Sequence, residues 1–415
     1  MSRVKKGYKQ TKVGIIPEEW EVVRLDKIIR YKKGYAFKSS DYQTEGVPII
    51  RVSDTGFNKI NDSNLVCIDK EKAKIYDSYK LKTDDIIITT VGSKPPLYDS
   101  MVGKIILVPK KNENHLLNQN AVKIFSKIAN NRYIFYQFLS KRYIYHIKTI
   151  YRGNANQASI TLNDLFAFSL PLPPLKEQQK IAQILTTWDR AISNVELLIL
   201  NYELRKKGLM QKLLSGEVRF EGFDGEWEEV RLGDVAEIIM GQSPSSKSYN
   251  ENKEGVPLIQ GNADCKNRKT APRIYTTEKT KVCNIGDIIM TVRAPVGVIS
   301  KAYHNACIGR GVCAIRTKDD NGFLYYYLLK YEEKWEKYSQ GSTFTAVNSN
   351  DIKSLKIKFP PLEEQQKIAQ LLTTADREIE LLKEELEALK EQKRGLMQKL
   401  LTGEVRVKIN GGERL

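Results

Sequence analysis

One segment of the sequence occurs twice at a fixed distance, and this repeat limits the possible folds more than any other feature. PPLKEQQKIAQILTTWDRAI, from Pro173, returns as PPLEEQQKIAQLLTTADREI from Pro360, and KKGLMQKLLSGEVR, from Lys206, returns as KRGLMQKLLTGEVR from Lys393. The offset is 187 residues throughout, and 28 of the 47 positions from Pro173 are identical to those from Pro360. A duplication of this length predicts two copies of one structural unit.

Weaker similarity links the segments between the repeats. Three pairs of short motifs correspond: EWEVVRL at Glu19 with EWEEVRL at Glu226, GVPIIR at Gly46 with GVPLIQG at Gly255, and DDIIITTVG at Asp84 with GDIIMTVRAPVG at Gly286. Their offsets differ (207, 209 and 202), so the loops between them differ in length. We therefore expect a globule over 1–172, a conserved helix over 173–220, a second globule over 221–359, and a second conserved helix with a C-terminal tail over 360–415.

The conserved segments have the pattern of long coiled-coil helices. Apolar residues recur at alternating steps of four and three, interrupted at one position per helix by Lys206 and Lys393. This spacing keeps one apolar stripe facing a partner helix. The predicted seam consists of Ile181, Leu185, Trp188, Ile192, Val195, Ile199, Tyr202, Leu209 and Leu213 in the first helix, and Ile368, Leu372, Ala375, Ile379, Leu382, Leu386, Leu389, Leu396 and Leu400 in the second.

The ends of both helices are also marked in the sequence. Each begins after a Pro-Pro pair and carries acidic residues in its first turn, Glu177 in one and Glu363 and Glu364 in the other, where the helix dipole favours them. Each stops at a glycine, Gly216 or Gly403. Two core helices of separate domains would give the same stripes, but their common register favours pairing with each other.

The segments outside the helices are rich in predicted strands. Short β-branched runs such as VPII, DIIITTV and GKIILV in the first, and DIIMTV and GVCAIR in the second, are separated by Gly, Pro, Asn and Ser. Helical stretches are expected near Arg132–His146 and Phe323–Tyr338. We therefore predict an α/β or α+β fold for each globule, with long loops.

The charge of the chain favours an anionic partner. There are 67 Lys and Arg residues against 50 Asp and Glu, a formal net charge of +17. Most of the excess lies in residues 1–172, with 29 basic and 16 acidic side chains, whereas residues 221–359 have 20 and 18. A basic patch binds nucleic acid by releasing counterions from the phosphates, although a solvated basic face is the alternative explanation.

Other classes of protein are disfavoured. No apolar run approaches the roughly 18 residues needed to cross a membrane, and the N-terminal residues lack a signal peptide. The five cysteines (Cys67, Cys265, Cys283, Cys307, Cys313) form no Cys-x-x-Cys pair, and the three histidines (His115, His146, His304) lie far apart, so no metal site is expected. We expect a soluble, cytoplasmic protein with reduced thiols.

Several loops combine basic, aromatic and amide side chains, which position phosphates and recognise base edges. Taken singly, such loops are more often ordinary turns, but they recur at parallel places in both globules. The candidate DNA-binding residues are Lys32, Lys33, Tyr35, Phe37, Lys38, Arg51, Ser93, Lys94, Asn118, Gln119, Arg152, Asn154 and Gln157 in the first globule, and Gln242, Ser243, Ser245, Lys247, Tyr249, Gln260, Asn262, Arg293, Arg310, Thr343 and Phe344 in the second.

These motifs resemble those of the specificity subunit of type I restriction–modification systems along nearly the whole chain. The matching motifs are PPLxEQQKIA at the start of each conserved helix, GLMQKLL-S/T-GEVR at its end, and RAPVG with CIGRG in the second globule. The resemblance implies two target-recognition domains that each bind half of a split DNA sequence. It also implies two conserved helices packed antiparallel as a spacer, a direction that the heptads alone do not determine.

The resemblance also implies partners and cofactors. Two modification subunits that methylate adenine from S-adenosylmethionine, and restriction subunits that use ATP and Mg, would supply the catalysis; no cofactor is expected in this chain. Gln178, Gln179, Gln365 and Gln366 are candidate docking residues on exposed helix faces, although a merely solvated face is the alternative for each.

Two other functions remain as alternatives. A self-sufficient DNA adenine methyltransferase needs an Asn/Asp-Pro-Pro-Tyr/Phe loop around the flipped base, and KPPL at Lys94 lacks the amide and the aromatic residue. A nuclease or ATPase needs clustered carboxylates or a GxxxxGK[ST] loop, and the second is absent. A coiled-coil scaffold without sequence-specific DNA binding would explain the helices but would leave the loop-rich globules without a role.

Overall fold

The computed structural model describes residues 4–95, 100–154, 157–318, 320–341 and 346–409. The chain forms two compact units, each with its own core. The first unit contains residues up to Asn194 together with the chain from Glu387 onward, and the second contains Val195–Leu386. Each long helix therefore begins in one unit and ends in the other.

The first unit is built on small sheets, of which the four-stranded one is antiparallel and a three-stranded one is mixed. Its four-stranded sheet has the order β11–β9–β13–β4, and a three-stranded sheet has the order β12–β5–β8. The strands of these sheets are β4 (Arg30–Lys33), β5 (Val47–Ile50), β8 (Val66–Ile68), β9 (Ile86–Thr89), β11 (Ile105–Leu107), β12 (Leu116–Leu117) and β13 (Ala121–Phe125). Smaller sheets consist of β10 (Val91–Gly92), β15 (Gln157–Ser159) and β14 (Arg152–Asn154); β16 (Ser169–Leu172) and β3 (Glu21–Arg24); β1 (Tyr8–Thr11) and β2 (Gly14–Pro17); and β6 (Thr55–Gly56) and β7 (Lys59–Ile60).

The second unit repeats this plan with larger sheets. Its six-stranded sheet has the order β18–β28–β25–β26–β22–β21, and its five-stranded sheet has the order β19–β23–β20–β27–β24. The strands are β18 (Ala236–Met240), β19 (Tyr249–Asn250), β20 (Val256–Ile259), β21 (Cys265–Lys266), β22 (Lys269–Thr270), β23 (Ile274–Thr276), β24 (Val282–Cys283), β25 (Ile288–Thr291), β26 (Ile299–Lys301), β27 (Ala306–Ile308) and β28 (Val312–Thr317), with β17 (Glu228–Arg231) paired to β29 (Lys356–Phe359).

Short helices cover these sheets. The first unit has α1 (Leu25–Ile28), α2 (Lys70–Ala73), α3 (Asn131–Phe138), α4 (Lys141–Ile150), α5 (Leu162–Phe166) and the 3-10 turns η1 (Ser39–Asp41), η2 (Val52–Asp54), η3 (Lys74–Tyr79) and η4 (Lys110–Asn112). The second has α7 (Leu232–Val235), α8 (Gly322–Gly341), α9 (Ser349–Lys353), η5 (Ser246–Ser248) and η6 (Asn262–Asp264). These helices, and a strand order β4–β13–β9–β11 that recurs as β18–β28–β25–β26, confirm the predicted α+β plan and its repeat.

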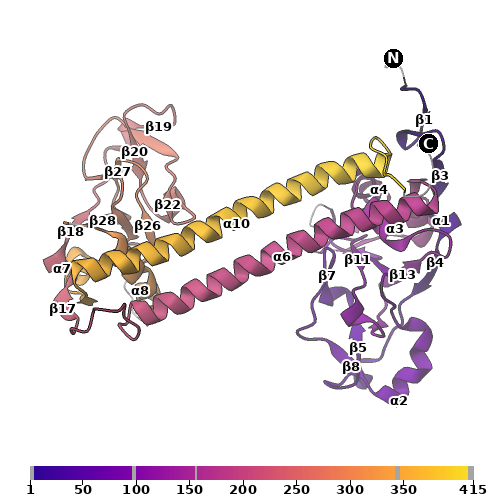
Figure 1. Ribbon diagram of the computed structural model, residues 1–415, viewed down its shortest axis with the longest axis horizontal. Coiled ribbons are helices and arrows are strands. Elements are labelled where there is room, and N and C mark those ends of the chain that lie inside the picture. Colours follow the sequence, from indigo (N-terminus) through magenta and orange to yellow (C-terminus); the bar gives the residue numbers. More distant parts are fainter. Residues whose placement is uncertain (1–3, 96–99, 155–156, 319, 342–345, 410–415) are drawn as a thin grey trace. The chain divides into compact units, whose positions relative to one another are not determined.

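The conserved segments form the two long helices α6 (Leu175–Leu213) and α10 (Leu362–Thr402), seen in Figure 1. Each begins directly after its Pro-Pro pair, where the missing N–H groups cost the helix nothing. Each ends before a glycine with a left-handed backbone, Gly216 (φ +74°) or Gly403 (φ +73°). Every residue of the predicted seam is buried or half-buried.

The two helices run antiparallel within each unit, as the contacts of the seam lysines Lys206 and Lys393 show. In the second unit, Lys206 near the end of α6 donates to Asp376 near the start of α10 at 2.5 Å. In the first unit, Lys393 near the end of α10 donates to Asp189 near the start of α6. Each aspartate also accepts from a tyrosine hydroxyl of its unit, Tyr326 or Tyr136.

A buried ion pair fixes the start of each long helix. Glu177 of α6, 1% exposed, accepts from Arg406 and from the indole N–H of Trp20. Glu364 of α10, fully buried, accepts in the same way from Arg219 and Trp227. Both glutamates lie in the first turn of their helix, as predicted, and each also forms an ion pair there.

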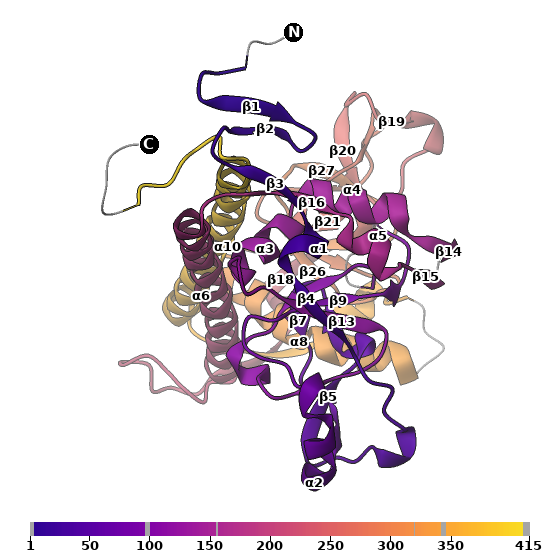
Figure 2. The same ribbon diagram turned by 90° about the vertical axis from the view of Figure 1, so that its right-hand side faces the viewer.

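The N-terminal hairpin completes the first unit against the end of α10. The Tyr8 hydroxyl donates to the Gly403 carbonyl at 2.9 Å, and a Cβ at Gly403 would collide with Pro17. Figure 2 shows the β1–β2 hairpin beside the C-terminal end of α10.

Candidate nucleic-acid interface

Four loops of the first unit meet through backbone hydrogen bonds. They follow β4, β5 and β9 and connect β12 to β13. The bonds that join them are Gly34 N to Ala121 O (2.9 Å), Tyr35 N to Leu117 O (2.9 Å), Asn118 N to Ile50 O (3.0 Å) and Thr90 N to Asn120 O (2.8 Å). These loops hold Tyr35, Arg51, Ser93, Asn118 and Gln119, which were predicted separately from the sequence.

The second unit holds its four equivalent loops together in the same way. The corresponding bonds are Gly241 N to Val312 O (3.0 Å), Gln242 N to Ile308 O (2.9 Å), Gly309 N to Ile259 O (2.8 Å) and Val292 N to Gly311 O (2.9 Å). Gly34 and Gly241 must be glycine for this approach, because a Cβ would collide with the carbonyl oxygen of Asn118 or Gly309. We call each set of four loops the loop cluster of its unit.

The loop cluster of the second unit surrounds a hollow of about 270 Å³. It is lined by Ser243, Gln260, Gly261, Asn262, Arg293, Ala294, Arg310 and Gly311. Five predicted residues from four loops therefore share one hollow, which offers amide and guanidinium donors together. Tyr249 supports it, since its hydroxyl accepts from the side-chain amide of Gln260 at 3.0 Å.

The other predicted residues of the second unit that the structure describes do not line this hollow. Gln242, Ser245 and Lys247 are exposed. The Ser245 hydroxyl accepts from the backbone N–H of Lys247 at 3.4 Å and so caps the turn η5. Thr343 and Phe344 lie outside the described residues.

The loop cluster of the first unit carries an aromatic surface. Tyr35, 36% exposed, packs against Tyr76 and Tyr79 of η3 with ring centroids 4.7 and 5.1 Å apart, and the Lys32 ammonium lies 4.5 Å from the Tyr79 ring. Tyr76 and Tyr79 were not predicted as site residues. The only sequence indication was their closeness to Lys74 and Lys80, because their contact with Tyr35 depends on the fold.

Two predicted residues of this loop cluster are buried. Phe37, 8% exposed, packs in a core with Ile49 and Leu116, so its ring supports the loop and is not free to contact a base. Asn118, also 8% exposed, accepts from the N–H of Gln119 at 2.6 Å and donates to the Tyr42 hydroxyl at 3.2 Å. Its neighbour Gln119 is exposed.

Arg51 is held by a carboxylate of its own loop. Its Nε and one terminal nitrogen each donate to Asp54 at 2.8 Å. This hydrogen bonding raises the pKa of the Arg51 guanidinium above its ordinary value. Two of its donors are thereby already used, which limits what Arg51 offers a ligand.

The other predicted residues of the first unit lie at the rim of its loop cluster or beyond it. Lys33, Lys38, Lys94 and Gln157 are exposed, and Ser93 is half-buried. Arg152 in β14 donates to Asp164 at 3.0 Å. Only the backbone of Asn154 is described, paired with Gln157.

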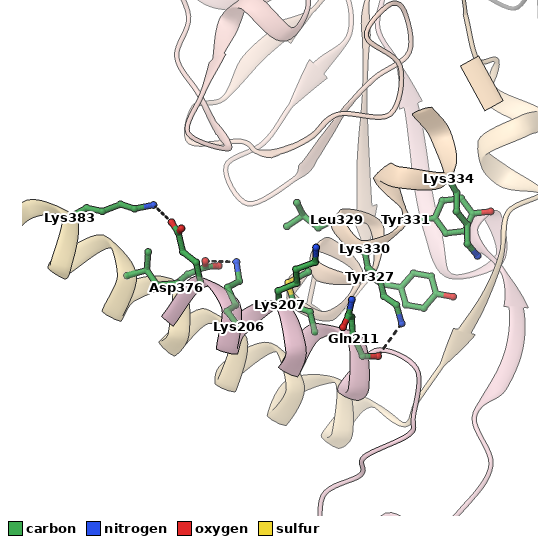
Figure 3. Close-up of a pocket in the computed structure, with 13 residues that line it drawn as sticks. Lys206, Lys207, Gln211, Tyr327, Leu329, Lys330, Tyr331, Lys334, Asp376 and Lys383 are labelled. Atoms are coloured by element: carbon green, nitrogen blue, oxygen red, sulfur yellow. Dashed lines mark hydrogen bonds and ion pairs between the residues drawn. The ribbon is translucent and has the colours of Figure 1, made fainter. Parts of the chain in front are cut away.

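A second basic feature of the second unit lies between α6, α8 and α10. A hollow of about 670 Å³ is lined by the five lysines Lys206, Lys207, Lys330, Lys334 and Lys383, with Glu203 and Asp376 as its acidic residues (Figure 3). Burial, together with the charge of Lys334, lowers the pKa of Lys330, whose ammonium donates to the Gln211 carbonyl at 3.3 Å. Three of these lysines lie on the long helices and two on α8, so the positive surface is shared between the helices and the globule.

Two of the four glutamines proposed for docking are structural. Gln178 and Gln365 are 2% and 6% exposed, and each donates to the carbonyl of the first proline of its Pro-Pro pair at 2.7 Å. They fix the helix start and are not available to a partner, which corrects that prediction. Gln179 and Gln366 are exposed.

The described residues contain no group of three or more His, Cys, Asp and Glu placed to hold a metal ion. Within the same ranges, no helix is long and apolar enough to cross a membrane. The cysteines Cys67, Cys265, Cys283, Cys307 and Cys313 are unpaired.

Comparison with known proteins agrees with this duplicated arrangement. The model of the type I restriction modification DNA specificity domain matches residues 17–201 and 224–391. The chain belongs to this family. It is 35% identical, over 97% of both chains, to the specificity subunit described for the type I restriction enzyme MjaX of Methanocaldococcus jannaschii.

Solved structures of the family have the same fold. One, from work on complex assembly and conformational transition of the type I restriction–modification system, is 27% identical with a TM-score of 0.59, covering 94% of this chain and 99% of the other. The S subunit from M. genitalium has a TM-score of 0.64 over 92% and 96% of the two chains, and at 17% identity it supports the fold alone. The role of this chain is that of a type I specificity subunit, which recognises DNA sequence.

Proposed function

We propose that each unit recognises one half of a bipartite DNA target through its loop cluster. The observation that supports this most is the recurrence of the same four backbone hydrogen bonds in both units, although the side chains on the loops differ. A conserved frame with variable side chains is what sequence recognition requires, because base contacts specify while the frame positions them.

The long helices would set the unread gap between the half-sites. An α-helix rises 1.5 Å per residue, and α6 and α10 contain 39 and 41 residues. Half-buried lysines at seam positions favour a single antiparallel register, because a shifted register would leave them without the aspartates. A fixed register gives a fixed length.

Catalysis would reside in partner subunits. Two modification subunits would methylate adenine from S-adenosylmethionine, and restriction subunits would use ATP and Mg to cleave DNA. No loop of the sequence has the Asn/Asp-Pro-Pro-Tyr/Phe motif that would hold a flipped adenine. This chain would therefore provide recognition and assembly, with no cofactor of its own.

The test is to map methylated adenines across the genome of cells that carry this chain with its modification subunits. We expect one split motif with a constant gap, lost in cells that lack this chain. Purified complex should retain that preference in a gel shift with excess competitor DNA. Binding without sequence preference at every salt concentration would instead identify a scaffold.

A further inference from the structure

The two loop clusters can be compared position by position, because their backbone pairing matches. Val91 pairs with Ser159 in the first unit, and Arg293 pairs with Ala346 in the second. The bonds to Ala121 and Val312 fix a second correspondence, in which Gln119 takes the place of Arg310. At both positions the second unit has an arginine where the first has none.

These two arginines differ from others in the second unit. Arg268, Arg273 and Arg316 are each paired with a carboxylate, Glu332, Asp264 and Asp287 respectively. Arg293 and Arg310 are exposed and line the hollow of about 270 Å³. Among the described residues, neither guanidinium has a hydrogen-bond or ion-pair partner, so their donors are available to a ligand.

The surroundings favour a base edge over a phosphate alone. The hollow adds the neutral side chains of Ser243, Gln260 and Asn262 to the two guanidinium groups. A guanidinium donates two parallel hydrogen bonds to O6 and N7 of guanine, the commonest specific contact in the major groove. Glutamine at the position of Arg310 in the first unit instead suits adenine, which presents one donor and one acceptor.

We propose that Arg293 and Arg310 each contact the O6 and N7 edge of a guanine in the half-site of the second unit. The proposal rests on the proposed function, since it assigns base chemistry to a recognition surface. It requires at least two G·C pairs in that half-site. It also makes Arg293 and Arg310 specificity-determining residues without a catalytic role.

The experiment uses the purified complex of this chain with its modification subunits and the duplex target found by methylation mapping. Each guanine is replaced in turn by 7-deazaguanine, which keeps Watson–Crick pairing but lacks the N7 acceptor. We expect a loss of affinity of about 5- to 150-fold at each of two guanines in one half-site.

Arginine-to-lysine variants identify the residue responsible and separate base recognition from phosphate binding. Lysine keeps the charge but lacks the planar fork. R293K and R310K should each lose sensitivity to 7-deazaguanine at one guanine, the one that the replaced arginine contacts, while affinity for unrelated DNA stays unchanged. R231K, at an exposed arginine of β17 outside the hollow, is the matched control and should keep the full sensitivity.

Two results would overturn the proposal while leaving the proposed function intact. In one, the complex binds its target specifically but 7-deazaguanine has no effect in either half-site. In the other, sensitivity to 7-deazaguanine persists at every guanine of the second unit's half-site in both lysine variants. If the wild-type complex shows no sequence preference, the proposal and the proposed function both fail.

Discussion

At the scale of single residues, the most consequential contacts join positions far apart in the sequence. Glu177 and Arg406 are separated by 229 residues, and Glu364 and Arg219 by 145. The sequence showed that GEVR and PPLxEQQ are duplicated together, but it gave no evidence that the glutamate of one copy pairs with the arginine of the other. Burial of a carboxylate requires such a partner, and only the fold identifies it.

Glu364→Ala should destabilise the second unit strongly. The change leaves the half-buried Arg219 guanidinium and the indole N–H of Trp227 without their acceptor. Removing one partner of such a hydrogen-bonded set costs about 1–3 kcal/mol. Hydrogen exchange of backbone amides in the second unit measures the loss. Glu363→Ala, one residue earlier and exposed, is the control, and an equal effect of both changes would contradict a structural role for the pair.

In the candidate site, loop composition could be predicted from the local sequence, but burial could not. Glycine-flanked loops with amide and basic side chains were predictable, and four of them converge in each unit. The burial of Phe37 and Gln178 was not predictable, because an aromatic residue or a glutamine has the same local pattern whether it contacts a ligand or the core. Burial depends on which loops come together.

At the scale of elements, the coiled-coil seam could be predicted because heptad spacing is a local property of one helix. The direction of packing could not, since an apolar stripe is equally compatible with both directions. Lys206 and Lys393 interrupt the stripe in the sequence, and their partners Asp376 and Asp189 reveal the direction.

An exposed apolar stripe on the outer face of α6 is the surface where we expect a partner helix to dock. Leu197, Leu200 and Leu204 are spaced by three and four residues and are 59%, 51% and 59% exposed, on the side away from the seam. A half-exposed apolar stripe on a helix is a typical docking surface for another helix. Replacing the three leucines by serine should weaken retention of the modification subunits by about tenfold or more, since each buried leucine contributes on the order of 1 kcal/mol or more.

Co-purification and a binding titration measure this effect. The melting temperature should change little, because the leucines already face solvent. Leu381→Ser on α10 is the matched control: Leu381 is 55% exposed, with no exposed large apolar residue three or four positions away. Equal retention of the subunits by the triple variant and the control would exclude the stripe as their docking surface.

At the scale of the whole molecule, the duplication predicted two globules and two helices, but not how the chain is shared between compact units. Each unit takes the first half of one long helix and the second half of the other. This follows from antiparallel packing of equal helices, because the end of α10 must then lie beside the start of α6. Periodicity within either helix carries no such information.

The length of the paired helices should determine the unread gap in the DNA target. Inserting one heptad after Asn194 and one after Leu386, where each helix passes between the units, keeps the seam pattern and adds about 10 Å to each helix. At 3.4 Å per base pair, the preferred gap should lengthen by about three base pairs while both half-sites stay the same.

Replacing an existing heptad in each helix with the inserted sequence, at constant length, is the control and should leave the gap unchanged. Methylation mapping reads out both variants, and an unaltered gap after insertion would show that the helices do not set the spacing.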